Sequence, residues 1–179
     1  MNVTALMKNF LDRFAYTLHR PRFFRQKAMI VCTTGALGLK EAMDRLSVIR
    51  HAGFDLVHKA GFYTPESNVS LKSLSKIDKG IDLAARKFFE ALQMTKSPSP
   101  KLIELMAFRA QQAAFAACHD YNLAECDYNY FKNKGWLERN RQYYTDAKIN
   151  PLKNMIVLMV GKMVKRKTLE DLRGVPWNS

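Results

Sequence analysis

The stretch KAMIVCTTGALGLKEAMDRLSVIRHAGFDLVHKAGFY, residues 27–63, decides the fold of this chain. It begins with AMIVC (28–32), a short continuous apolar run of the kind found in strands that are buried on both faces. Apolar residues then recur at helical spacing from Leu39 until Gly53, and FDLVHKAGFY (54–63) has the composition of a second strand. Strand, helix and strand in this order predict a βαβ unit whose two strands are parallel and joined right-handedly.

An amphipathic helix is predicted before this unit. In MNVTALMKNFLDRF, residues 1–14, apolar side chains recur every three or four positions and therefore share one face. Asn2 or Thr4 can cap its first turn, because amide and hydroxyl oxygens accept hydrogen bonds from backbone N–H groups. HRPRFFRQK, residues 19–27, has the character of a basic connector broken by Pro21.

Another amphipathic helix is predicted after the second strand, where Ser75 and Asp78 form a capping-box pattern. TKSPSP, residues 95–100, is then a punctuated linker in which Ser99 and Pro100 suit the N-cap and the first position of a further helix.

Beyond this linker the composition is helical throughout. The sequence predicts helices within residues 101–122, within residues 123–144 up to Gly135, and from an Asn-Pro cap within residues 150–172. We therefore expect an α/β domain over residues 1–97 and an all-helical extension over residues 98–179.

The composition favours a folded chain with anionic partners. Lys and Arg number 29 against 16 acidic residues, a formal charge of +13, and 47% of the residues are hydrophobic. The cysteines Cys32, Cys118 and Cys126 cannot form an even-numbered disulfide framework, which favours a reducing compartment. Because the longest apolar run, residues 155–160, is too short to cross a bilayer and no signal peptide is recognised, we expect a cytoplasmic protein.

The loop CTTGALG, residues 32–38, is the first candidate site. Open α/β sheets bind ligands at the carboxyl ends of their strands, and glycine lets the backbone approach a ring or a phosphate closely. The same residues also suit an ordinary strand-to-helix turn, so the spacing alone leaves both interpretations open. Two parallel strands with three helices are too few for a stable layered domain, so either a partner supplies more strands or the chain is a shortened form of a larger architecture.

Three segments resemble the flavodoxin-like NAD(P)H-dependent FMN reductases, the clostridial flavodoxin-family oxidoreductases. The family's Asn-Val-Ser/Thr segment and its Lys-x-Phe-Ile/Leu-Asp-Arg-Phe helix are matched by Asn2, Val3, Thr4, Lys8, Phe10, Leu11, Asp12, Arg13 and Phe14. Its basic connector is matched by His19, Arg20, Pro21, Phe24 and Lys27. KNKGWLERNRQYYTDAKIN, residues 132–150, is similar to the Gly-Trp-Leu and Tyr-Tyr elements of the C-terminal extension that several members carry.

The resemblance implies a flavodoxin-like parallel-sheet sandwich and FMN-dependent oxidation of NAD(P)H, with transfer to a small acceptor such as a flavin, a quinone or a nitro compound. It further implies a possible homodimer and a flavin ring held between the start of the first helix and the loop after the first strand. The residues implied in cofactor binding are Asn2, Thr4, Thr33, Thr34, Gly35 and Gly38. Since the flavin carries the hydride chemistry, no catalytic acid–base pair is expected.

The sequence departs from the family at its N-terminal side. The family's first three strands and the Gly-Ser-Pro-type loop that cradles the FMN phosphate have no counterpart, so the chain is expected to be an N-terminally truncated member with impaired flavin binding. The alternative is a non-catalytic basic binding module, or a degenerate fragment, that contacts nucleic acid or an acidic membrane surface.

Three further patterns each allow two interpretations. Cys118, His119 and Cys126 lack metal-ligand spacing, so we expect a helix surface and no metal site. Aromatic residues interleaved with basic ones over residues 121–144 resemble a nucleic-acid surface, but no RNA-binding signature accompanies them, so we expect them to pack the extension onto the sheet. MIVLMVGKMVKRK, residues 155–167, suits a helix buried in the extension or in a dimer interface, or else a membrane-surface anchor, and we expect burial.

Overall fold

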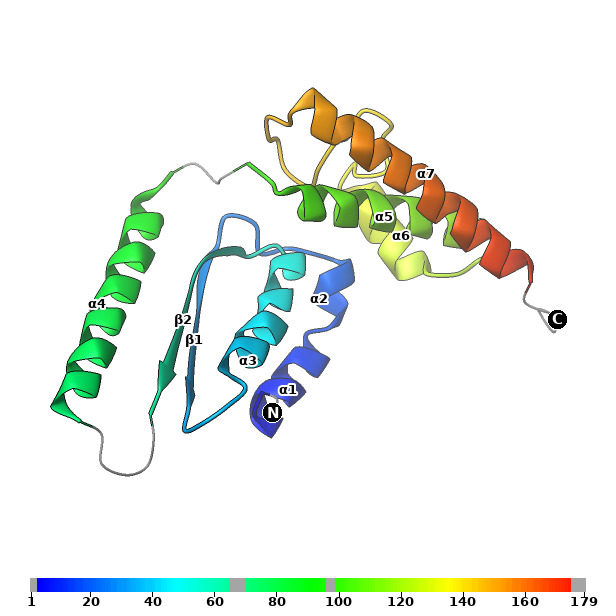
Figure 1. Ribbon diagram of the computed structural model, residues 1–179. Helices are drawn as coiled ribbons and strands as arrows, with labels where there is room; N and C mark the ends of the chain where they lie inside the picture. The colour runs from blue at the N-terminus through cyan, green and yellow to red at the C-terminus, as the bar shows by residue number, and fades with distance from the viewer. Residues whose placement is uncertain (1–2, 65–69, 96–98, 175–179) are drawn as a thin grey trace. The chain divides into compact units, whose positions relative to one another are not determined.

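The computed structural model describes residues 3–64, 70–95 and 99–174, which form an α/β structure. The chain divides into two compact units, residues 1–97 and 98–179, here called the αβ unit and the helical unit. The αβ unit contains α1 (Ala5–Arg13), α2 (Tyr16–His19), β1 (Lys27–Thr34), α3 (Leu39–Leu46), the 3-10 helix η1 (Ser47–Ala52), β2 (Asp55–Tyr63) and α4 (Leu71–Gln93), all labelled in Figure 1 except η1. The helical unit contains α5 (Leu102–His119), α6 (Glu125–Asn133) and α7 (Pro151–Arg173).

The two strands pair in parallel, as predicted, from Lys27 opposite Asp55 to Thr34 opposite Tyr63. At the amino-terminal end of the sheet the ammonium of Lys27 lies 2.5 Å from the carboxylate of Asp55, with both side chains largely buried. The helix predicted from Leu39 is α3, which tightens into η1 before the chain turns at Gly53. No third strand pairs with either edge in the part of the chain that the structure describes.

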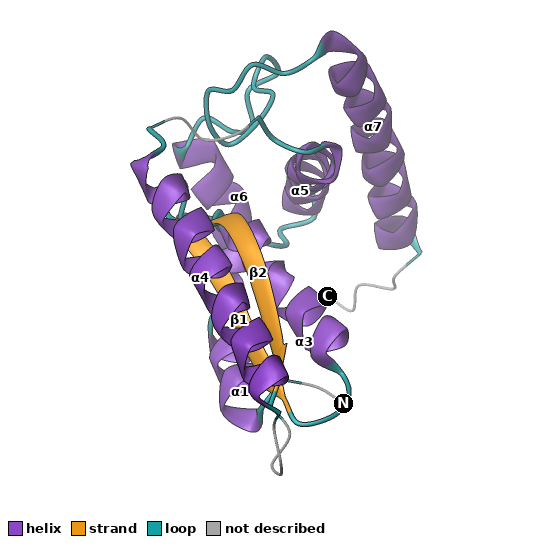
Figure 2. Cartoon of the chain, turned by 60° about the vertical axis from the view of Figure 1, so that its left-hand side comes forward, coloured by secondary structure: helices purple, strands orange, loops and turns teal. Residues whose placement is uncertain are grey.

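Helices α3 and α4 cover opposite faces of this sheet, as Figures 1 and 2 show. Neighbouring residues of β2 face the two helices in turn, because side chains alternate along a strand. A Cβ atom on Gly61 would lie only 2.8 Å from the side chain of Leu39 in α3. A Cβ atom on Gly80 of α4 would likewise lie only 2.8 Å from the ring of Phe62. Because neither glycine has a side chain, α3 can approach one face of the sheet at Gly61, and α4 can approach the other face at Gly80.

The prediction that residues 28–32 are buried on both faces is wrong. Only Ile30 is buried, and Val31 is 53% exposed. The apolar face predicted for the first helix is likewise not covered, since no residue of α1 is buried and Leu6 is 84% exposed. A sheet of two strands is too narrow to cover these side chains, whereas the prediction of burial assumes a wider sheet.

Two helix starts differ from the sequence prediction. Helix α4 begins before the Ser75–Asp78 capping box, because Ser70 caps it by accepting a hydrogen bond from the backbone N–H of Ser73 at 3.2 Å. Helix α5 begins at Leu102 and not after Ser99, and the carboxylate of Glu104 accepts a hydrogen bond from the backbone N–H of Lys101 at 2.8 Å. These corrections lengthen α4 and shorten α5 at their N-terminal ends.

Other helix ends agree with the sequence prediction. Thr4 caps α1 by accepting a hydrogen bond from Met7 N–H at 3.3 Å, and Asn150 caps α7 by accepting one from Leu152 N–H at 2.9 Å. Helix α6 ends just before Gly135. Hydroxyl and amide oxygens therefore satisfy N–H groups that the first turns leave without partners.

An aromatic cluster forms the core of the helical unit. Phe108 of α5, Phe131 of α6 and Trp136 are buried, and the rings of Phe131 and Trp136 meet edge to face at 5.2 Å. Trp136 donates its indole N–H to the backbone carbonyl of Tyr144 at 3.0 Å, and the Tyr144 hydroxyl donates to Gln111 of α5 at 2.5 Å. The aromatic residues after α6 thus pack on α5 within this unit.

Helix α7 packs on α5 through one face only. Val157 is buried, and Gly161 approaches the Cβ atom of Arg109, which lies 3.6 Å from where a Cβ on the glycine would be. Val157 is the only buried residue of the segment 155–167. The prediction that this segment is buried in the extension is therefore wrong, while its burial in a dimer interface stays a prediction.

The Tyr144 hydroxyl predicts a loss of stability at alkaline pH. Burial, with a smaller contribution from Tyr143, raises the pKa of Tyr144 above its ordinary value. In the unfolded chain the Tyr144 hydroxyl ionises near pH 10, while in the folded chain it keeps its proton. The contribution of this hydroxyl to the free energy of unfolding is therefore complete below about pH 10 and is lost as the pH rises further. Tyr144→Phe should lower the free energy of unfolding by about 1 kcal/mol at neutral pH and flatten its decline above about pH 10.

Urea unfolding followed by circular dichroism at several pH values measures both effects. Tyr63→Phe, at an exposed position of β2, is the control. Its free energy of unfolding should decline with pH as steeply as that of the natural chain. Equal slopes for Tyr144→Phe and the natural chain would contradict the prediction.

Candidate functional site

The loop after β1 lies at the carboxyl end of the parallel sheet. Thr34 ends the strand, and its hydroxyl donates a hydrogen bond to the backbone carbonyl of Leu37 at 3.0 Å, which closes the loop on itself. Gly38 follows in the left-handed region with φ 83° and forms the N-cap of α3. The backbone N–H of Thr64 donates to the carbonyl of Thr34 at 2.8 Å, so the end of β2 is tied to the same loop.

This end of the sheet is open to solvent. Thr33, Gly35 and Leu37 are exposed, and Tyr63, the last residue of β2, exposes 55% of its surface. A Cβ atom on Gly35 would meet nothing closer than the carbonyl oxygen of Thr64 at 3.9 Å. The loop therefore offers uncovered backbone, a threonine side chain and a neighbouring phenol ring to a ligand.

The start of α1 lies at this same end of the αβ unit, as both ribbon views show (Figures 1 and 2). Thr4 is there as the N-cap of the helix. Asn2, which was also expected to bind the cofactor, lies outside the described residues. The structure thus brings together Thr33, Thr34, Gly35 and Gly38 at the end of β1 and the start of α3, and the N-terminal end of α1 lies at the same end of the αβ unit.

Two ionisable groups near the sheet, Asp44 and Cys32, have structural roles. Hydrogen bonds from Lys59 and Lys40 lower the pKa of Asp44 to about 2, so this carboxylate links α3 to β2. Burial raises the pKa of the Cys32 thiol, which disfavours a reactive thiolate at the end of β1. These two groups are not arranged for proton transfer or nucleophilic attack.

Among the residues that the structure describes, no group of three or more His, Cys, Asp and Glu side chains could hold a metal ion. His119, one of the residues considered as a ligand, stacks on the ring of Tyr128 with centroids 3.7 Å apart. Burial raises the pKa of the neighbouring Cys118 thiol. The ring stacking assigns His119 to packing.

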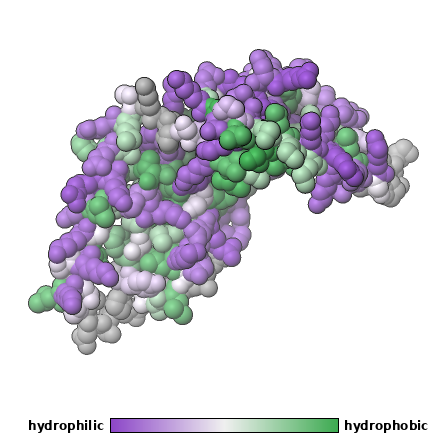
Figure 3. All heavy atoms as spheres, turned by 45° about the horizontal axis from the view of Figure 1, so that its top comes forward, coloured by the Kyte–Doolittle hydropathy of each residue, from purple (hydrophilic) through white to green (hydrophobic). Residues whose placement is uncertain are grey.

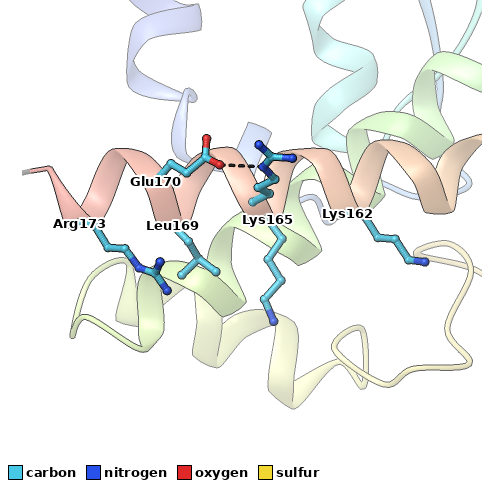
Figure 4. Close-up of a pocket in the computed structure, with 6 residues that line it drawn as sticks. Lys162, Lys165, Leu169, Glu170 and Arg173 are labelled. Carbon is cyan, nitrogen blue, oxygen red and sulfur yellow. Dashed lines mark hydrogen bonds and ion pairs between the residues drawn. The ribbon is translucent and has the colours of Figure 1, made fainter.

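Two features of these surfaces were not predicted from the sequence. Tyr63 and Thr64 meet the loop because β2 runs parallel to β1, which the βαβ pattern already predicts. In the helical unit, α7 carries a hollow of about 370 Å³ with four cationic side chains around it (Figure 4). This basic hollow is lined by Lys162, Lys165, Arg166, Leu169, Glu170 and Arg173. Helical spacing is the signal that could have revealed it.

Comparison of the chain with protein-family models, curated proteins and solved structures gives no match. Within residues 3–64, 70–95 and 99–174, no helix is long and apolar enough to cross a membrane. Function is therefore inferred from the residues and their geometry.

The loop glycines should respond differently to a methyl group. Gly38→Ala places a Cβ atom on a left-handed residue and should lower the free energy of unfolding by about 1–2 kcal/mol. Gly35→Ala adds an exposed methyl group without a clash and should leave the free energy of unfolding nearly unchanged. Urea unfolding of the two variants measures this contrast, and equal destabilisation would contradict it.

Proposed function

We propose that the chain binds FMN at the carboxyl end of β1 and β2 and uses it to pass electrons from NAD(P)H to a small acceptor such as a flavin, a quinone or a nitro compound. In this proposal the αβ unit corresponds to the C-terminal part of a flavodoxin-like domain. The observation that supports it is the exposed, glycine-containing loop at the carboxyl ends of a parallel strand pair, which is where open α/β sheets bind ligands.

The chain's own residues would hold and orient the ring. Gly35 leaves the backbone bare, so a flat ligand can approach its peptide groups. Thr33 is exposed beside this loop, and Tyr63, which is opposite Thr34 in the strand register, supplies an aromatic ring against which a flavin can stack. The N-terminal end of α1 carries a partial positive charge that favours electron density on a ring carbonyl.

The electron transfer itself belongs to the cofactor, because a flavin accepts a hydride from a nicotinamide and passes electrons on singly or in pairs. The protein contributes position and charge. A net charge of +13 attracts both FMN and NAD(P)H, which carry phosphates. FMN binding should therefore weaken with salt, because its phosphate is attracted by the positive charge. It should also depend on Gly35, because the ring approaches the backbone there.

A titration of the full chain with FMN tests the proposal. We expect quenched flavin emission, a shift of the flavin absorption bands, and bleaching of the bound flavin by NADPH or NADH without oxygen. Gly35→Ala should weaken binding by about tenfold, because its methyl group would stand between the ring and the backbone. Riboflavin, which lacks the phosphate, should bind and should show the same sensitivity to Gly35→Ala.

Gly174→Ala is the matched control for this titration. It adds the same methyl group in the helical unit, where the nearest heavy atom lies 3.7 Å away, and should leave FMN affinity unchanged. Free-flavin spectra at every protein concentration would refute the proposal. Equal FMN affinity of Gly35→Ala and the natural chain would refute the proposed place of the ring.

A further inference from the structure

The outer face of α7 carries a row of exposed aliphatic side chains. Residues 152, 155, 156, 159 and 163 follow helical spacing and share one face. This apolar stripe consists of Leu152, Met155, Ile156, Met159 and Met163, each between 45% and 70% exposed. Figure 3 shows apolar side chains gathered on the helical unit with hydrophilic ones beside them.

The apolar stripe cannot turn into the core of its own unit. The other face of α7 is already occupied, since Val157 is buried and Gly161 lies against Arg109 of α5. Rotating the helix would expose Val157 and bring Arg109 against larger side chains. Five exposed aliphatic side chains on one helix face are typical of a surface that another molecule covers.

Charge identifies the covering molecule as anionic. The basic hollow lies along the same helix as the stripe, and Lys162 and Arg166 follow Met159 and Met163 by one turn each. Figure 4 shows Lys162, Lys165 and Arg173 extending from one side of α7. Glu170 pairs with Arg166 at 2.7 Å, so one of four cations is engaged, and no carboxylate pairs with Lys162 or Lys165 among the described residues.

We propose that α7 binds the surface of an anionic phospholipid bilayer, with the apolar stripe at the level of the acyl chains and the cations of the basic hollow on lipid phosphates. A protein partner fits less well, because the stripe is a convex ridge without Trp or Tyr, the residues that dominate protein interfaces. Aliphatic side chains beside lysines suit a fluid interface, since lysine extends its ammonium group to the headgroups. This inference concerns the helical unit and is independent of flavin binding.

Vesicle sedimentation of the full chain tests the proposal. The chain should sediment with phosphatidylcholine vesicles that contain about 30% phosphatidylserine and stay in solution with phosphatidylcholine alone at about 0.15 M salt. Lys162→Glu/Lys165→Glu should weaken binding at least about twentyfold, since each cation near an anionic surface contributes roughly fivefold. Met155→Glu/Met159→Glu should weaken it more than about tenfold, because carboxylates do not enter the apolar layer.

Matched controls lie on α4 and at its C-cap, Met94. Lys72→Glu/Lys76→Glu and Leu92→Glu/Met94→Glu make the same changes at exposed positions of the other unit and should alter binding by less than about threefold. Equal losses in test and control variants would reduce the effect to net charge and overturn the proposal. Circular dichroism checks that each variant keeps its helices.

A tryptophan at the interface gives a second, direct measurement. Emission of Met159→Trp should shift to the blue on adding the anionic vesicles, while Met94→Trp should not shift; no shift in Met159→Trp would overturn the proposal. A dimer of the natural chain that Met155→Glu/Met159→Glu dissociates, without vesicle binding, would assign the stripe to a second copy. Binding to duplex DNA that needs Lys162 but not Met155 would assign the hollow to nucleic acid, and either result overturns the lipid assignment.

Discussion

A single parallel ladder between β1 and β2 supports the αβ unit. Parallel pairing forces the chain to cross back through α3 and η1, so both strands end at the same edge of the sheet. The loop from Thr33 to Gly38 and the end of β2 therefore meet whatever their side chains are, and the hydrogen bond from Thr64 to Thr34 fixes that meeting. The parallel direction of the two strands, more than the identity of any residue, therefore determines where the candidate site lies.

The narrowness of that sheet also limits what the unit can bury. Its buried apolar residues are small for the most part, four of them alanines: Ile30, Leu39, Ala52, Leu56, Ala60, Ala84 and Ala91. The helical unit instead buries Phe108, Phe115, Phe131 and Trp136, whose rings contact one another around α5. Because buried area determines hydrophobic stabilisation, the two units are stabilised by cores of different composition, one mainly aliphatic and one mainly aromatic.

The sequence predicts those features of the fold that depend on nearby residues. The strands, their parallel pairing and the caps at Thr4 and Asn150 follow from short patterns, and so does the position of the candidate loop. The start of α4 does not, because Ser75 and Asp78 match the capping-box pattern whereas the residue that caps the helix is Ser70, one turn earlier. The exposure of Val31 depends on the number of strands in the sheet, and no pattern within residues 28–32 contains that number.

The surface of α7 shows the same limit from another side. Residues 155–160 are apolar nearly all round the helix, so periodicity cannot choose which face meets α5. The packing of Val157 makes that choice and leaves Met155 and Met159 outside. Helical spacing groups Lys162 and Arg173 on one side of the helix, but only the packing against α5 shows that these cations and the apolar stripe both stay exposed.

The alternation of Gly61 and Phe62 on β2 has a consequence for how the αβ unit tolerates change. Gly61 sets the distance of α3 from the sheet, whereas the fit of Phe62 over Gly80 sets the distance of α4. The packing of α3 and the packing of α4 therefore depend on different residues of the same strand. Either helix can be repacked by substitutions on its own face while the opposite helix keeps its contacts, so the sheet acts as a partition between two independently adjustable layers.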